Sequence, residues 1–492
     1  MTNKKRFTYK PLWLALSSAL LVQACAIPTI ETRNPNLDLP EQFNAKVSQV
    51  DTQAGYGEKD STQANIQWSE WFNDPTLTAL VETAVKNNQE VSILIQRINM
   101  ASNEVYAREG EYLPRLSAGI AAETEKVGEY TREGAVEEQL NIKEDKEFPD
   151  PLANLKLGLN ASWEIDVWHK LRDASKVASL EYLASVESKN FFVTQLVSEV
   201  ARAYYELLAL DNKLENLDST ISLQRNVIHT INALKEYGRA SSLPVARFNA
   251  EVKKNESERY LIEQEILEKE NMLNLLLGRT PQPIQRDSSV LLDAKIINPQ
   301  VGVPSALLDN RPDIKQAALT LQAAELNIDV AKANFYPSFE LKAGLGLSAF
   351  DSRYLFNVPE SLAYSLSGDV FAPLINRRAI EAVYQNASAE QIEAAYEYEL
   401  TVLTAVAEVT TSLSKLDNLE KSAEARRHQI ASLEQSIDIA NRLFSSAHGE
   451  YLEVLLAQRE ALEARSEFIE TRQQQMAALV DLYQALGGGW QS

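Results

Sequence analysis

Four short segments of the chain alternate between apolar and polar residues. They are residues 116–124, 155–167, 339–349 and 362–372, and the alternation is cleanest in the second and third. A period of two places successive side chains on opposite faces, so each segment predicts a β-strand with one apolar and one polar face. The sequence therefore predicts two β-hairpins, with a long charged connection at 125–154 and a shorter one at 350–361.

Outside the strands, apolar residues repeat at intervals of three and four, which predicts helices. Residues 171–236 and 378–447 contain no Pro or Gly and predict helices of unusual length. Their apolar positions form a stripe rather than a long run, which favours packing as coiled coils. Asp74–Pro75 is a typical helix start, and breaks are expected at 238–244 and 448–449. Shorter helices are expected at residues 74–112, 245–277, 313–333 and 452–486.

The two halves of the chain resemble each other. Residues 88–91 are echoed by residues 311–314 at an offset of 223, and the match continues at an offset of about 206 to 209. Such a period is too long for a solenoid and predicts duplication of a whole helix–strand–helix unit. On this interpretation, residues 71–290 form the first repeat and residues 291–492 form the second.

The amino-terminal residues are typical of an export signal. Four basic residues precede the apolar segment Pro11–Val22, which is too short for a permanent membrane anchor. Cys25, the only cysteine, follows a small residue and is the predicted site of lipid attachment. Val22 and Gln23 depart from the usual lipoprotein pattern, so an ordinary signal peptide is the alternative. We therefore expect a signal peptide at 1–24 and a lipidated linker at 25–70.

Charge and motif content exclude several functions. The 492 residues carry a net charge of −21, and such an acidic surface repels nucleic acid. The four histidines show no metal-ligand spacing, and nucleotide-binding, metalloprotease and serine-hydrolase motifs do not occur. We therefore expect no enzyme activity, no cofactor and no metal. Abundant helix carboxylates have an ordinary explanation in pairing with Lys and Arg.

Strands with one apolar and one polar face fit a wall between lipid and a wet lumen. A soluble sandwich, in which one face is also polar, is the alternative. Four strands are too few to close a membrane barrel, which needs about eight, and an open edge in lipid leaves backbone groups unpaired. Three copies of four strands give twelve, enough for an open interior. The sequence thus predicts a homotrimeric pore with long helices extending from it.

From Trp68 to Trp490 the chain resembles the TolC-like outer-membrane efflux proteins, in the lipoprotein branch that serves resistance-nodulation-division pumps. Each motif is weak alone, but their order and spacing together are specific. The motifs are Trp71-Phe72-Asn73-Asp74-Pro75, Tyr112-Leu113-Pro114, Ser162-Trp163-Glu164-Ile165-Asp166-Val167-Trp168 with Arg172, Val303-Pro304-Ser305, Leu308-Asp309-Asn310-Arg311-Pro312-Asp313-Ile314, Phe335-Tyr336-Pro337, Phe371-Ala372-Pro373-Leu374, and Tyr451-Leu452-Glu453-Val454-Leu455 with Ala457-Gln458.

The resemblance implies an α+β membrane protein and a trimeric channel. Three chains would form a twelve-stranded transmembrane β-barrel, continuous with a long periplasmic α-helical barrel and an equatorial mixed α/β belt. Such a channel lies in the outer membrane, is anchored by lipid and extends into the periplasm. It would dock a periplasmic adaptor and an inner-membrane pump, and would expel toxic compounds or drugs.

The resemblance also implies a periplasmic gate at the second helix break. There Glu450 and Glu453, in three copies, would form carboxylate rings that narrow the opening and attract cations. His448 lies in the same break, and Arg239 lies at the corresponding place in the first. Family members often carry Asp where this chain has Leu456, so that ring is absent or relocated. Solvated tip residues without a gating role are the alternative.

Two other functions stay open at this point. The channel would also suit type I protein secretion, although the lipoprotein signal favours pump-linked efflux. A periplasmic coiled-coil adaptor is a lipoprotein with long helices as well, but it needs only one helical hairpin and no membrane strands. The exported substrate cannot be deduced from this chain, because selection belongs to the pump.

Overall fold

The computed structural model describes residues 27–37, 39–40, 43, 67–143, 146–147, 149–238, 241–294, 304–446 and 450–490. Its residues fall into two compact units, each built from three segments of the chain. Unit 1 consists of Met1–Asn34, Met100–Tyr182 and Leu319–Ala395, and unit 2 consists of Pro35–Asn99, Leu183–Ala318 and Tyr396–Ser492. Both predicted repeats contribute residues to each unit.

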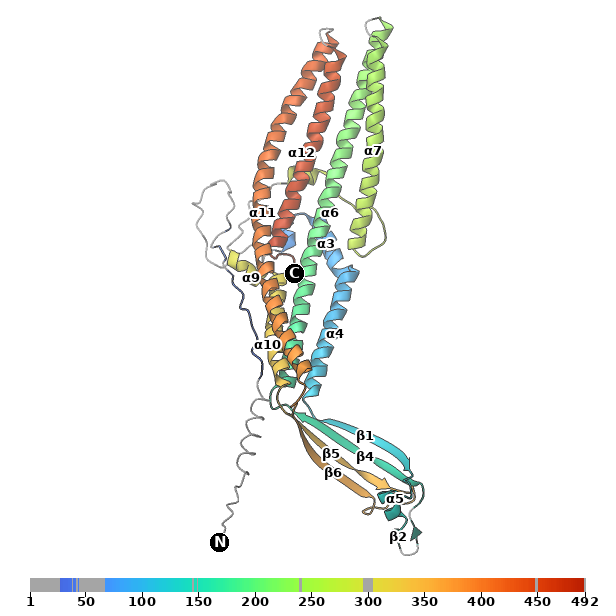
Figure 1. The fold of residues 1–492 in the computed structure, drawn as a ribbon. Helices are drawn as coiled ribbons and strands as arrows, with labels where there is room; N and C mark the ends of the chain where they lie inside the picture. Colours follow the sequence, from blue (N-terminus) through green and yellow to red (C-terminus); the bar gives the residue numbers. More distant parts are fainter. Residues whose placement is uncertain are drawn as a thin grey trace, which may run out of the picture. The chain divides into compact units, whose positions relative to one another are not determined.

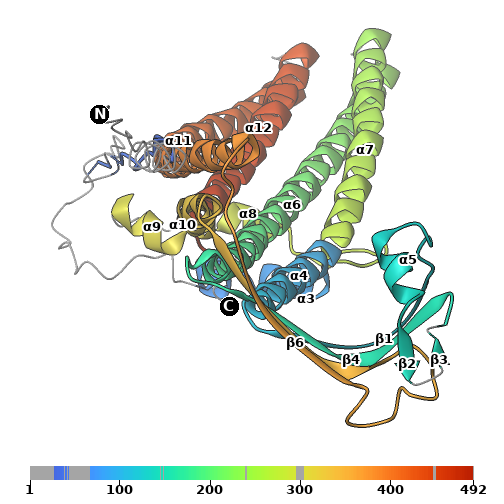
Figure 2. The ribbon, with the colours of Figure 1, turned by 60° about the horizontal axis from the view of Figure 1, so that its bottom comes forward.

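Unit 1 contains a four-stranded sheet in the order β1-β4-β5-β6, with every neighbouring pair antiparallel. The strands are β1 Arg115–Glu125, β4 Leu152–Ile165, β5 Ser338–Ala349 and β6 Leu362–Phe371. Figure 2 shows that they form one curved sheet. All four predicted strands and both predicted hairpins are therefore confirmed. The pairing of β4 with β5, which joins the two hairpins, is a further feature that periodicity alone does not predict.

The connection between β1 and β4 has structure of its own. It holds the helix α5 Arg132–Glu137 and the short strands β2 Asn141–Lys143 and β3 Lys146–Glu147. The Thr131 hydroxyl accepts a hydrogen bond from the Gly134 amide at 3.2 Å and so caps α5. The helix and strands of this connection are too short to show a periodic pattern, so the sequence predicted only a long charged loop.

Two long helices dominate the rest of the chain. They are α6 Lys170–Glu236 and α11 Arg378–Ser445, which confirms the two predicted long helices. In unit 2, α6 lies beside α7 and α11 lies beside α12 (Figure 1). The remaining helical elements are α2 Trp68–Phe72, α3 Pro75–Asn87, α4 Gln89–Glu111, α7 Ser242–Leu276, α8 Ser289–Asp293, the 3-10 turn η2 Pro304–Ala306, α9 Leu307–Asn310, α10 Pro312–Ala333 and α12 Tyr451–Ala485.

The expectation of one helix over residues 74–112 is wrong. Asn88 has an extended backbone and separates α3 from α4. Its Oδ1 accepts hydrogen bonds from the amides of Glu90 and Val91 at 2.8 and 3.2 Å, so the side chain caps the new helix. Asp74 caps α3 in the same way, by accepting from the Thr76 amide at 2.8 Å, which confirms the predicted start.

The first helix break is shorter than predicted. Helix α7 begins at Ser242, so Pro244 lies in its first turn. A proline is tolerated there because the first amides of a helix have no partner within the helix. No described helix carries an apolar stretch long enough to cross a membrane.

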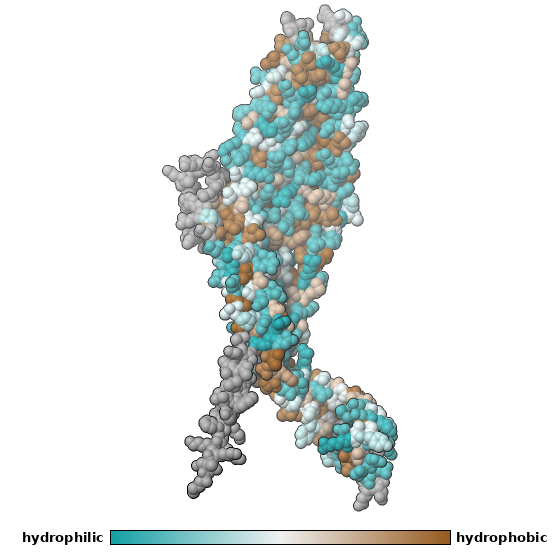
Figure 3. Space-filling model, viewed as in Figure 1, coloured by the Kyte–Doolittle hydropathy of each residue, from teal (hydrophilic) through white to brown (hydrophobic). Residues whose placement is uncertain are grey.

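Unit 2 packs around α6, α12 and α3. Its main apolar core contains fully buried tyrosines at 204, 205 and 483 and buried Leu77. Burial raises the pKa of the Tyr204 hydroxyl, and the nearby Asp74 carboxylate adds to the rise. The helical surface in Figure 3 is largely hydrophilic, with hydrophobic patches between the charged residues. The apolar stripes predicted for the long helices are therefore largely used in packing within this unit.

Candidate functional site

The register of the sheet places apolar residues of all four strands on one face. One row across the sheet is Ile120, Leu157, Leu347 and Leu362, and the next is Ala118, Leu159, Leu345 and Tyr364. Many of these side chains contact little else: Ile120 is 82% exposed and Tyr364 is 83% exposed. An exposed apolar surface of this kind marks contact with lipid or another protein.

The opposite face of the sheet is polar. One row is Ser117, Asn160, Gly344 and Ser365, and another is Glu164, Glu340 and Asp369. Lys342 lies in this second region, with its Nζ 2.9 Å from Glu340 and 3.5 Å from Asp369. Charged side chains on this face are stable only in contact with water or with one another. The sheet can therefore separate an apolar phase from an aqueous one.

Two tryptophans mark the end of the sheet where the strands meet helices. The indole of Trp163 donates to the Tyr112 carbonyl at 3.0 Å, and that of Trp168 donates to the Pro337 carbonyl at 2.8 Å. The Trp168 ring also stacks on Tyr336 at 4.7 Å. Aromatic rings with one polar atom favour the boundary between lipid and water. From the sequence, these tryptophans were recognised only as residues of a family motif, although the sequence already placed them at the end of a predicted strand.

The sheet has two open edges. Strands β1 and β6 each pair with one neighbour only among the described strands. Their outward backbone N–H and C=O groups therefore have no strand partner in this sheet. An open edge in a hydrocarbon layer leaves backbone groups without hydrogen-bond partners.

The structure describes two of the four predicted tip residues. Glu450 is the N-cap residue of α12, with an extended backbone and an exposed side chain that makes no capping bond. Glu453 lies in the first turn of α12 and is also exposed. His448 and Arg239, like Cys25, lie outside the described residues. The described part of the tip thus places two carboxylates together at a helix start, where negative charge is favourable.

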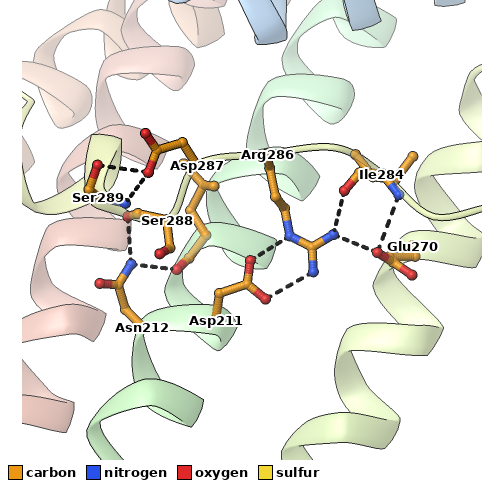
Figure 4. Close-up of polar contacts among 9 residues, drawn as sticks. Asp211, Asn212, Glu270, Ile284, Arg286, Asp287, Ser288 and Ser289 are labelled. Atoms are coloured by element: carbon orange, nitrogen blue, oxygen red, sulfur yellow. Dashed lines mark hydrogen bonds and ion pairs between the residues drawn. The ribbon is translucent and has the colours of Figure 1, made fainter.

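An ion cluster links the segment after α7 to both neighbouring helices (Figure 4). The Arg286 guanidinium binds both oxygens of Asp211 on α6, one of them at 2.9 Å, and also pairs with Glu270 on α7. Burial alone would lower the pKa of Arg286, but the bonds to the two carboxylates outweigh it and raise the pKa. The cluster holds the connecting segment against the α6–α7 pair.

A second buried arginine joins three helices. Arg311, with 5% of its side chain exposed, pairs with Asp313 on α10 at 2.6 Å and with Glu408 on α11 at 2.7 Å. It also donates to the carbonyl of Ala485 at the end of α12, at 3.0 Å. In the first half of the chain, Asn88 donates to the Leu276 carbonyl at the end of α7, also at 3.0 Å.

Residues 27–36 form an extended strap along α11. Ile27 and Ile30 belong to the apolar cluster of α10 and α11 in unit 1. The Gln391 side chain accepts from the Arg33 amide at 2.9 Å and donates to the Arg33 carbonyl at 2.7 Å. The sequence predicted only a linker here, because the residues lack periodicity. The pair of isoleucines three residues apart was the sequence feature that could have predicted this packing.

No group of three or more His, Cys, Asp or Glu suited to a metal ion occurs in the described part of the chain. What the described residues offer instead is a two-faced sheet with open edges and long helical hairpins. These features define the class of the protein: a membrane channel protein.

The family follows from comparison with known proteins. The family model described as "Outer membrane efflux protein" matches residues 80–279 and 303–488, most of the chain. The chain therefore belongs to the outer membrane efflux protein family, as its sequence motifs indicated.

Relatives and solved structures agree with this assignment. The chain is 27% identical over 481 residues to the pyoverdine export outer membrane protein OpmQ of Pseudomonas aeruginosa, covering 97% of this chain and 96% of that one. It is 28% identical over 437 residues to the toluene efflux pump outer membrane protein TtgF of Pseudomonas putida, covering 87% and 86%. The solved outer-membrane channel OprN has the same fold, with a TM-score of 0.82 at 21% identity over 95% of this chain and 100% of that one.

Proposed function

We propose that the chain is one subunit of a homotrimeric outer membrane channel, the exit duct of a tripartite efflux system. The channel passes small toxic compounds or drugs from an inner-membrane pump and a periplasmic adaptor across the periplasm and the outer membrane. The single observation that carries the proposal is the sheet, with one apolar face, one charged face and two open edges. The proposal includes no catalytic activity, cofactor or metal.

Closure of the sheet argues for three copies. Membrane barrels need about eight strands or more, and each chain contributes four to the sheet. Three copies of four strands give twelve, which leaves a lumen wider than side chains fill. Joining β1 of one copy to β6 of the next would remove every open edge. The native mass of the detergent-purified protein tests this; a mass of one chain would refute it.

Two observations support an internal duplication of the chain. The family model matches two separate segments of similar length, residues 80–279 and 303–488. The helix ends also correspond, because Gly278 after α7 and Gly487 after α12 both have a positive φ. Gly278 lies against the carbonyl of the residue before Asn88, and Gly487 lies against the carbonyl of the residue before Arg311. Separate expression of residues 71–290 and 291–492 tests the proposed boundaries: two halves that never reassociate would count against them.

The names of the relatives indicate which type of cargo to expect for this channel. They are named for pyoverdine export, toluene efflux and cation efflux, which favours small solutes over secreted proteins as cargo for this channel too. The family match likewise favours a channel over a coiled-coil adaptor. Deletion of the gene followed by toxicity assays would identify the cargo class; unchanged tolerance to small compounds together with lost protein secretion would contradict the proposal.

We also place a lipid anchor at Cys25. Cys25 is two residues before Ile27, which packs in the apolar cluster of unit 1, so a lipid there would be attached close in sequence to that contact. One acyl chain binds a membrane only weakly, so the sheet remains the main membrane anchor. Incorporation of labelled palmitate tests the anchor, and equal labelling of wild type and Cys25→Ser would exclude it.

A pair of neighbouring substitutions on β4 tests which face meets lipid. Leu159→Arg places a charge on the apolar face, where an arginine at mid-membrane costs about 2 to 4 kcal/mol per chain. Asn160→Arg places the same charge on the polar face one residue away. We expect Leu159→Arg to reduce the amount of heat-stable oligomer in outer membranes several-fold.

The control should assemble normally, because the Asn160→Arg side chain meets water. Quantitative immunoblotting of outer membrane fractions, with and without heating, compares the two variants directly. Equal loss of oligomer in both variants, or in neither, would refute the assignment of the apolar face to lipid.

A further inference from the structure

Three buried amide side chains interrupt the apolar seam of the helical hairpins in unit 2. On α6 the seam residues have heptad spacing and are Leu217, Ile221, Gln224, Ile228 and Ile231. On α7 the corresponding residues are Phe248, Val252, Asn255 and Ile262. On α12 they are Val454, Gln458 and Leu462. Among these seam positions, each helix therefore carries one amide, and the others are apolar.

The three amides lie at the same level of the bundle. Asn255 Nδ2 donates to Gln224 Oε1 at 3.1 Å, which joins α7 to α6. Asn216 on α6 donates to Ser466 Oγ on α12 at 3.3 Å. Eight residues further along α6 is Gln224, and eight residues back along the antiparallel α12 is Gln458. Because both helices rise equally per residue, Gln224 and Gln458 are brought level.

Two apolar clusters, one on each side of the amides along the helix axes, agree with this alignment of α6 and α12. Ile221 and Leu462 belong to one cluster, and Ile228 and Leu455 belong to the next. Gln224 and Gln458 are 1% and 3% exposed and lie between these clusters. The amide layer is therefore enclosed, with aliphatic side chains on both sides along the seam.

Two atoms of the layer have no hydrogen-bond partner within the described structure. They are Nε2 of Gln224, a donor, and Oε1 of Gln458, an acceptor. An unpaired donor on α6 and an unpaired acceptor on α12 thus lie at one level, and the two are complementary. A buried polar atom without a partner is unfavourable, so a register that keeps these complementary amides together is favoured over one that places them among apolar side chains.

We propose that Gln224, Asn255 and Gln458 form a register lock that fixes the axial position of α12 against the α6–α7 pair. The flanking Leu, Ile and Val residues cannot do this, because a shift of α12 by one turn again places aliphatic residues against aliphatic residues. The same shift would place Gln458 beside an aliphatic residue of α6, and would place an aliphatic residue of α12 beside Gln224. Single polar residues at seam positions are known to set register in coiled coils at a cost in stability.

The lock has a consequence for the proposed channel, and this consequence rests on the proposed function. A slip of one turn would move the start of α12 by about 5.4 Å relative to α6. Glu450 and Glu453 would move with it. The lock therefore sets the position of the proposed carboxylate rings along the helix axis.

Disulfide trapping in the full-length chain in membranes tests the lock. Cys25 is the only native cysteine, so pairs of introduced cysteines give products that peptide mass identifies. The pair Ile228→Cys with Leu455→Cys reports the observed register. Ile228→Cys paired with Arg459→Cys or with Tyr451→Cys reports a shift of one turn in either direction.

Each cysteine pair is placed in four backgrounds. They are the parent, the triple variant Gln224→Leu/Asn255→Leu/Gln458→Leu, the single variant Gln458→Leu, and the control Ser198→Ala. Ser198 is a fully buried polar residue of α6 whose hydroxyl bonds within its own helix, to Thr194. The single variant keeps the Gln224–Asn255 bond and remains informative where the triple variant does not fold.

The parent and the control should cross-link only the observed pair. The two leucine variants should also cross-link a shifted pair, at least several-fold above the parent. Cross-linking confined to Ile228 with Leu455 in both leucine variants would overturn the proposal. It would do so without affecting the proposed channel, which the sheet substitutions test separately.

Discussion

At the scale of single residues, buried arginines connect segments that are distant in the sequence. Arg311 is 5% exposed and binds Asp313, Glu408 and a carbonyl at the end of α12. Burial alone would lower its pKa, but the two carboxylates outweigh this and raise it. The guanidinium therefore stays charged, and its loss would leave two carboxylates without their counterion.

We expect Arg311→Met to destabilise the protein by about 3 kcal/mol, the lower end of what is lost when one partner of a buried ion pair is removed. Arg202→Met is the control, because Arg202 also bridges to α12 through Asp481 at 2.7 Å but is 38% exposed. An exposed pair is worth about 1 kcal/mol or less. Denaturant melts of the purified variants give the comparison, and equal losses would contradict it.

The sequence could not predict these ion pairs. Arg286 and Asp211 are 75 residues apart, and Arg311 and Glu408 are 97 apart. Nothing in the local pattern distinguishes them from the many solvated charges on the helices. Arg311 was recognised as a family motif residue, but its partners depend on how α10, α11 and α12 pack. Helix caps such as Asp74 were predictable because their bonds are local.

At the scale of elements, glycines end both return helices where the backbone needs a left-handed conformation. Gly278 has φ +66° and Gly487 has φ +85°. A Cβ on Gly278 would lie 2.3 Å from the Asn87 carbonyl oxygen, far inside contact distance. The end of α7 can therefore approach the junction of α3 and α4 only with glycine at this position.

We expect Gly278→Ala to lower the melting temperature much more than Gly238→Ala. Gly238 has a similar φ of +70°, but a Cβ there would meet nothing within 4 Å. The control variant therefore carries only the left-handed penalty of about 1 to 2 kcal/mol. Gly278→Ala adds a clash with backbone, which cannot move aside. Thermal unfolding followed by circular dichroism compares them, and matching melting temperatures would disprove the argument.

The long elements were predictable and the junctions were not. Alternation in residues 155–167 identified β4 because every second side chain faces one phase. The absence of Pro and Gly identified α6 and α11. The break at Asn88 was missed because an asparagine within a helical pattern carries no distinct signal until its side chain caps the next helix. The pairing of β4 with β5 was missed because periodicity does not specify partners.

At the scale of the whole molecule, the proposed gate depends on copies of α12. Its N-cap residue Glu450 and its first-turn residue Glu453 are exposed to solvent. Three chains would bring six such carboxylates to one opening. Carboxylates gathered at one opening repel one another and attract mobile cations.

We expect the double variant Glu450→Ala/Glu453→Ala to show a higher single-channel conductance in planar bilayers or a weaker preference for cations. Glu460→Ala with Glu463→Ala is the control, since both lie further along α12, away from its first turn. The control should conduct like the parent. Identical conductance and selectivity in all three proteins would remove the gate assignment and leave the pore itself intact.

The strap along α11 has a consequence for the order of events during synthesis. Arg33 leaves the ribosome early, but the Gln391 side chain that holds it is made 358 residues later. At about 5 to 20 residues per second, the partner helix follows only after some tens of seconds. The amino-terminal segment must therefore wait undocked until most of the polypeptide exists. Its docking is possible only on a chain whose synthesis has passed the first part of α11.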